Sequence, residues 1–157
     1  MTGTLVQIIW IYNIHIDQSS GFLDYGYPAP MDSDEKHRLA KFGEVGLEAC
    51  AIRLRASRKV TGLQQKEMAA AAHVSKSVLN NAEMGLTYPN REIMQYLYRE
   101  HRIDFNFMMA GLYAQLPGDV QERLFPALEV ASNEWDQKER SGRSRTSQRQ
   151  AQSQTAT

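Results

Sequence analysis

The sequence predicts an all-α protein, and three patterns support this prediction. Apolar residues recur at helical spacing over residues 45–56 and again over residues 120–135. Residue types that cap helix starts stand before several of the apolar segments: Ser75, Asn90 and Asp104. Glycines, which often end helices, follow such segments: Gly62, Gly85 and Gly111. We expect disordered termini on either side of this helical region.

Residues 1–43 are predicted to form a poorly ordered N-terminal extension. The β-branched and aromatic segment from Leu5 to Tyr12 favours a strand, and Ser, Gly and Pro residues typical of turns follow it up to Pro30. A single strand has no partner to pair with. Three interpretations stay open: a swapped strand or partner-binding arm, a loosely ordered extension, and a translation start at Met31.

Residues 44–113 have the pattern of a dense run of short helices. The first carries one apolar face, formed by Val45, Ala49, Ile52 and Ala56. The second ends at a tight turn at His73 and Val74, and a third follows from Lys76 to Met84. Two more begin after Asn90 and Asp104. We interpret several large apolar residues here as core, with a ligand pocket as the alternative: Met94, Phe105, Phe107, Met108 and Met109.

Residues 117–137 are predicted to form one more helix, which could serve in dimerisation. Its apolar residues recur at helical spacing, although Pro126 predicts a kink or a restart within it. Residues 138–157 are Ser, Arg, Gln and Thr without aliphatic periodicity, and we predict a disordered basic tail. Two interpretations of this tail stay open: a flexible charged tether on nucleic acid, and a solvated tail that does not contact DNA.

The charge and the rare residues exclude several classes of protein. The 157 residues have a formal net charge of zero, but residues 51–76 carry six basic groups and one acidic group, an asymmetry that points weakly to nucleic acid. A single cysteine, Cys50, excludes an internal disulfide and a cysteine zinc cluster. The longest apolar run, Leu5 to Ile16, is too short for a transmembrane helix. We therefore expect no cofactor, no metal, no membrane contact and a cytoplasmic location.

Residues 63–85 predict two short helices across a tight turn, an arrangement whose second helix fits the major groove of DNA. The chain resembles the phage-repressor-like (Cro-type, XRE family) helix-turn-helix regulators over residues 45–111, under half of its length. The pattern is in register without a gap at Arg58, Gly62, Leu63, Gln65, Met68, Ala69, Val74, Ser75, Leu79, Glu83, Gly85 and Pro89. It continues at Ile93, Leu97, Ile103, Phe105, Phe107, Met108 and Gly111.

The resemblance implies a five-helix lambda-repressor-like domain over residues 44–113, with the C-terminal helix added to it. Two residues depart from the family pattern. Gln64 stands where Ser or Thr caps the second helix, which weakens the cap by about 0.5–2 kcal/mol. His73 stands where the turn has glycine, and a left-handed conformation there costs roughly 1 kcal/mol.

The resemblance also implies roles for individual residues. Gln65 would contact a DNA phosphate, and Ser75 would cap the recognition helix and touch a phosphate. The residues on the exposed face of that helix would contact base edges: Lys76, Ser77, Asn80 and Asn81. Tyr88 and Arg91 would contact the DNA backbone after that helix. Arg58 and Glu83 would form a structural salt bridge, which leaves other cations as electrostatic contributors: Arg53, Arg55 and Lys59.

These expectations define a nucleoid-associated regulator of transcription, most simply a repressor, that binds double-stranded DNA as a homodimer without performing chemistry. The alternative is an antitoxin-type or other protein-interaction module that uses the same helices for autoregulation and its flanking segments to hold a protein partner. An enzyme is disfavoured because the sequence has no glycine-rich phosphate loop, metal-ligand spacing or nucleophile–base pair.

Overall fold

The computed structural model describes residues 15–16, 23–24 and 31–154. The chain divides into two compact units, Met1–Asp32 and Ser33–Thr157. In the first, strand β1 (His15–Ile16) pairs antiparallel with β2 (Leu23–Asp24), a short β pair that the all-α expectation does not include. The predicted strand from Leu5 to Tyr12 lies outside the described residues.

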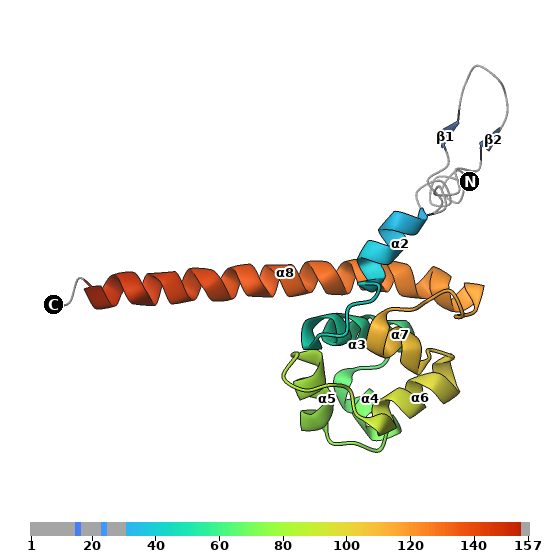
Figure 1. Cartoon of the computed structure of the whole chain (residues 1–157), viewed down its shortest axis with the longest axis horizontal. Helices are drawn as coiled ribbons and strands as arrows, with labels where there is room; N and C mark the ends of the chain where they lie inside the picture. Colours follow the sequence, from blue (N-terminus) through green and yellow to red (C-terminus); the bar gives the residue numbers. More distant parts are fainter. Residues whose placement is uncertain (1–14, 17–22, 25–30, 155–157) are drawn as a thin grey trace, which may run out of the picture. The chain divides into compact units, whose positions relative to one another are not determined.

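The second unit is entirely helical within residues 33–154, which confirms the predicted class. Figure 1 shows a group of short helices beside one long helix. The helices are α2 (Ser33–Ala40), α3 (Leu47–Thr61), α4 (Gln65–Ala71), α5 (Lys76–Glu83), α6 (Arg91–His101), α7 (Phe105–Ala110) and α8 (Gly118–Gln154).

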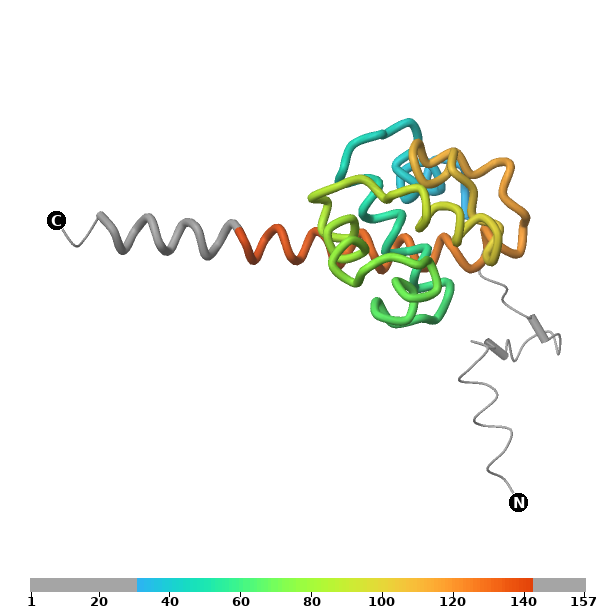
Figure 2. The backbone as a smooth tube through the Cα atoms, turned by 90° about the horizontal axis from the view of Figure 1, so that it is seen from below, coloured from blue at the N-terminus to red at the C-terminus, as the bar shows by residue number. Residues whose placement is uncertain are grey.

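Helix α3 is the centre of this unit. It packs against α5, α7 and α8, and every residue from Ala49 to Leu54 is buried. These six consecutive residues span more than one helical turn, so the middle of α3 is enclosed on every side. Figure 2 shows the surrounding chain wrapped around it from a second direction. Short helices are only marginally stable by themselves, and packing around α3 holds them in a fixed arrangement.

The folded unit begins at Ser33, so the prediction of a poorly ordered extension up to residue 43 is wrong for its last part. Asp34 and Glu35 lie in the first turn of α2 and Arg38 in its last turn, which complements the helix dipole. Leu39 is buried where α2 packs against α8. Val45, predicted on an apolar helix face, is 58% exposed because α3 starts only after Gly46.

Helix α8 extends much further than the sequence predicts. It passes through Pro126 without a restart. Pro126 is exposed, so the carbonyl that it leaves without a helical partner can be hydrated. The helix also continues to Gln154, where we predict a disordered tail. The arginine, glutamine and alanine of this segment favour helix even though none of its positions is aliphatic beyond alanine.

The apolar face of α8 is part of the core of its own chain. Its buried residues are Val120, Leu124, Phe125, Leu128, Ala131 and Trp135, and the helix packs mainly on α3 and α2. Val120, Leu124 and Leu128 are fully buried, and each such aliphatic side chain contributes about 1.5–3 kcal/mol. This face therefore stabilises the fold of a single chain. The possible role of residues 117–137 in dimerisation would need another face of α8 and stays a prediction.

The predicted core residues divide into two groups. Phe107 and Met108 are fully buried, as expected. Met94 and Met109 are half-buried, and Phe105 is 38% exposed and packs against the ring of Tyr98 at 6.2 Å between centroids. None of the helices described is long and apolar enough to cross a membrane.

Candidate nucleic-acid interface

Helices α4 and α5 meet across the tight turn that the sequence predicts. His73 has a φ of 55°, in the left-handed region, as expected for a position where glycine is usual. The Ser75 hydroxyl caps α5 by accepting a hydrogen bond of 3.2 Å from the Val78 backbone N–H. At the start of α4, the Gln64 backbone N–H donates to the Glu67 carboxylate at 2.8 Å. This bond offsets part of the stability that α4 loses through the weak N-cap residue Gln64.

One face of α5 is polar and accessible, and the other is buried. Lys76, Ser77 and Asn80 are exposed and Asn81 is partly exposed. These positions are one, four and five residues from Lys76, a spacing that gathers them on one side of a helix. Leu79, Ala82 and Glu83 form the buried side. The structure thus brings together the four residues that are predicted to contact bases.

The end of α5 is held by hydrogen bonds from Arg58 and Arg55 to Glu83, a residue that is almost fully buried. We call these bonds the clamp on Glu83. Arg58 Nε donates to Glu83 Oε1 at 2.5 Å and Arg58 Nη2 donates to Oε2 at 3.3 Å, the ion pair that the sequence predicts. Arg55 Nε donates to the Glu83 backbone carbonyl at 2.7 Å. Because α3 supplies both arginines, α5 is fixed to the centre of the fold.

Gln65 has an internal role that the sequence does not predict. Its side-chain Nε2 donates to Glu83 Oε2 at 3.0 Å and to Asn80 Oδ1 at 3.3 Å. These bonds tie the first residue of α4 to two residues of α5. The predicted phosphate contact of Gln65 stays a prediction, and making it would require the amide to exchange one of these partners.

Tyr88 and Arg91 lie beyond α5, in the loop and in the first turn of α6. Both side chains are exposed. The segment between them is ordered by buried Pro89 and by Asn90, whose side chain accepts a hydrogen bond of 3.1 Å from the Ile93 backbone N–H. Their predicted contacts with the DNA backbone stay predictions.

Arg53 is not an electrostatic contributor at the surface, and that prediction is wrong. Its side chain is fully buried, and burial lowers the pKa of the guanidinium, an effect opposed by Cys50 and Glu44. Each of its N–H groups donates to a backbone carbonyl. The acceptors, at 2.7 to 3.1 Å, belong to Ala40, Lys41, Glu44, Met108 and Met109. Arg53 therefore joins the C-terminal ends of α2 and α7, where the helix dipoles favour a cation.

The other cations of the basic block are also used within the fold. Arg55 lies over the Trp135 ring at 5.2 Å in addition to its bond with Glu83, and Lys59 Nζ pairs with Glu134 at 2.7 Å. Lys66 and Lys76 are exposed on α4 and α5. Lys66 is a candidate phosphate contact that sequence reasoning missed, although its position next to Gln65 could have indicated it.

Helix α8 also supports the end of α5. The Trp135 ring lies so close to Gly85 that a Cβ at this glycine would meet ring carbon Cη2 at 2.9 Å. Gly85 has a φ of 70°, which favours glycine independently. Lys138 Nζ lies 2.9 Å from Met84 Sδ. The C-terminal end of α5 is thus covered by the part of α8 around residues 135–138.

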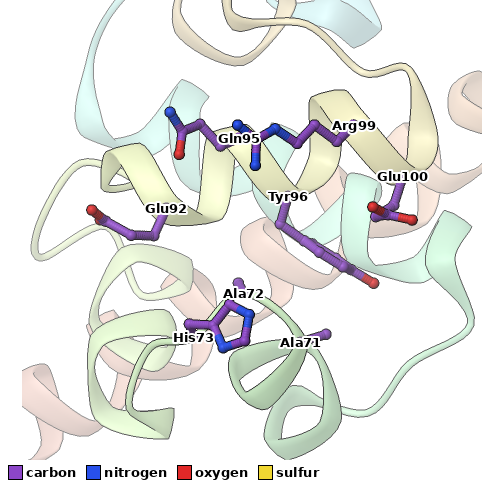
Figure 3. Close-up of a pocket in the computed structure, with 8 residues that line it drawn as sticks. All are labelled: Ala71, Ala72, His73, Glu92, Gln95, Tyr96, Arg99 and Glu100. Atoms are coloured by element: carbon purple, nitrogen blue, oxygen red, sulfur yellow. The ribbon is translucent and has the colours of Figure 1, made fainter.

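A half-open cavity of about 190 Å³ lies between the α4–α5 turn and α6. Figure 3 shows His73 and the end of α4 on one wall, with Glu92, Tyr96 and Glu100 of α6 on the other. The described residues contain no group of three potential metal ligands. None of the residues that line this cavity belongs to the exposed face of α5.

Comparison with protein-family models, with curated proteins and with solved structures finds no match for this chain.

Proposed function

We propose that this protein binds double-stranded DNA in a sequence-specific manner, with α4 and α5 as a helix-turn-helix and α5 inserted in the major groove. In this proposal α3 to α7 form the five-helix lambda-repressor-like domain. The B-form major groove is about 12 Å wide and accepts one α-helix. The function is binding alone, so the protein is proposed not to be an enzyme.

The observation that carries the proposal is the exposed polar face of a firmly held α5. Lys76 has the donors to reach guanine O6 and N7. The Asn81 amide has an oxygen that can accept from adenine N6 and an NH2 group that can donate to adenine N7. Base readout needs these groups at a fixed position, since a loosely held helix pays the ordering entropy on binding. The clamp on Glu83 and the cap on α5 supply that rigidity.

The phosphate contacts in this proposal come from the residues around α5. Gln65, Ser75, Tyr88 and Arg91 are placed by their match to the sequence pattern, and Lys66 by its exposure. Such contacts set the register of the protein on DNA without selecting a sequence.

The biological role that follows is regulation of transcription in the cytoplasm, most simply as a repressor that occludes its site. Two copies bound to half-sites one helical turn apart would give a symmetric operator. The apolar face of α8 is occupied within one chain, so a homodimer would need another surface. The symmetry of the selected DNA site tests this part of the proposal.

Asn81→Ala is expected to weaken binding to the preferred site by about 1–3 kcal/mol and to relax the choice of base at one position in each half-site. The reason is the loss of a side chain able to form two hydrogen bonds with one base. Sequence selection with the variant measures this change. Asn106→Ala, at an exposed position of α7, is the control and should leave the selected motif unchanged. An identical motif for Asn81→Ala and the original chain would contradict the assignment.

Gln65→Ala is expected to weaken binding by about 1 kcal/mol, to nearly the same extent on the preferred site and on random duplex. A phosphate contact carries no base identity, so the loss should not depend on sequence. Titration of both duplexes by fluorescence anisotropy provides the comparison, with circular dichroism to verify that α4 and α5 stay folded. A loss confined to the preferred site would show that Gln65 acts through Asn80 on base readout instead.

A further inference from the structure

One strongly charged segment has no DNA contact in the proposal above, namely α8 beyond Trp135. Residues 138–157 carry five basic groups and one acidic group, whereas residues 33–137 carry 13 basic and 14 acidic groups. The helical unit without this segment therefore has no excess of positive charge to attract a polyanion. Figure 1 shows α8 continuing past the short helices.

The buried face of α8 and its basic residues belong to one stripe. Steps of three and four residues connect the core positions Val120, Leu124, Leu128, Ala131 and Trp135. The same steps continue to Lys138, Gly142, Arg145 and Arg149. Residues at this spacing share one side of a helix. The stripe changes from apolar to basic at the point where the globular part ends.

The start of this basic stripe is fixed at the C-terminal end of α5. Trp135 packs against Gly85, and Lys138 Nζ lies next to Met84 Sδ. At a rise of about 1.5 Å per residue, position 149 lies about 16 Å further along the helix than Lys138. This distance corresponds to about five steps of a B-form strand.

We propose that the stripe of Lys138, Arg145 and Arg149 binds the phosphate backbone of the same duplex, beyond the base pairs that α5 contacts. This inference rests on the proposed function, and it adds a second contact region with a defined helical face. A flexible tail would use all of its arginines alike. A helix that lies on DNA uses one face, and Arg140 and Arg143 occupy positions on the other side.

Two double variants with the same change in charge test this proposal. Arg145→Gln/Arg149→Gln removes two cations of the stripe, and Arg140→Gln/Arg143→Gln removes two from the opposite side. The affinity of each full-length variant for a duplex with long flanks is measured at several salt concentrations. We expect the first pair to reduce the slope of log K against log salt by about 2, because each phosphate contact contributes about 0.9. The second pair should leave the slope nearly unchanged.

The results separate this proposal from the proposed function. Equal reductions for the two pairs would establish a flexible tail and overturn the helical face, and unchanged slopes for both would overturn contact with DNA by this segment. Absence of duplex binding by the original chain would overturn the proposed function and this inference together. Circular dichroism of each variant verifies that the helical content is unchanged.

Discussion

Replacing Arg53 with Met should destabilise the protein by at least about 3 kcal/mol. The substitution removes a donor from five backbone carbonyls. The Lys41 carbonyl keeps a bond from the Glu44 N–H and the Met109 carbonyl a weak one from the Cys50 thiol. The carbonyls of Ala40, Glu44 and Met108 lose the donor that the structure shows for them, and each buried acceptor without a partner costs about 1–3 kcal/mol. A domain of this size has a total stability of about 5–15 kcal/mol. Urea denaturation followed by circular dichroism measures the loss.

Two further variants serve as a control and a partial rescue for Arg53→Met. Arg99→Met changes an exposed arginine on α6 and should alter the stability by less than about 0.5 kcal/mol. Arg53→Lys keeps the charge but has three donors on a single nitrogen, so it should recover only part of the loss. A loss for Arg53→Met as small as that for Arg99→Met would show that Arg53 does not hold α2 and α7 together.

Gly111→Ala should destabilise the protein by about 2–4 kcal/mol. Gly111 has a φ of 69°, which costs an alanine about 1 kcal/mol. A Cβ at this position would also meet the Ala40 carbonyl oxygen at 2.3 Å and that of Lys41 at 2.9 Å. Both atoms are backbone acceptors of Arg53, so they cannot move without breaking its hydrogen bonds. Overpacking of this kind adds about 1–3 kcal/mol.

Gly62→Ala is the matched control for Gly111→Ala. Gly62 ends α3 with a φ of 72°, but a Cβ at this position has no neighbour within 4 Å. Its substitution should therefore cost only the conformational strain, about 1 kcal/mol. The difference in unfolding free energy between the two variants measures the cost of the close approach of α2 to Gly111. Equal losses of unfolding free energy for the two variants would show that this close approach adds no destabilisation.

The helix boundaries are the part of the fold that follows most directly from the sequence. Ser75, Asn90 and Asp104 each accept a hydrogen bond from the backbone three residues on, as N-caps do. Gly62 and Gly111 end α3 and α7 in the left-handed conformation. Capping depends on a few adjacent atoms, so a local pattern contains the information that is needed.

The role of Arg53 could not be predicted from its neighbours in the basic block. Its acceptors come from residues 40–44 and 108–109, which are distant in the sequence. One signal was present, because the residues around Arg53 on α3 are small or apolar on nearly every side. A charged side chain in such a helix requires internal hydrogen-bond partners.

The candidate site was predictable as a set of positions but not as a set of contacts. The exposed face of α5 and the pair of Arg58 with Glu83 follow from helical spacing and from the sequence resemblance. The bonds of Gln65 with Glu83 and Asn80 depend on the angle between α4 and α5. The packing of Trp135 on Gly85 depends on the course of α8, and no local pattern fixes either arrangement.

Selection of bound sequences from a random duplex library is the most direct test of sequence-specific DNA binding by this protein. The full chain, verified as folded by circular dichroism, is incubated with the library at moderate salt, and the bound fraction is sequenced over several rounds. We expect enrichment of one short motif, and we expect Asn81→Ala to relax the base choice at one position of each half-site of that motif. Recovery of a library with the starting composition, from a folded protein, would contradict sequence-specific DNA binding and favour a protein partner for these helices.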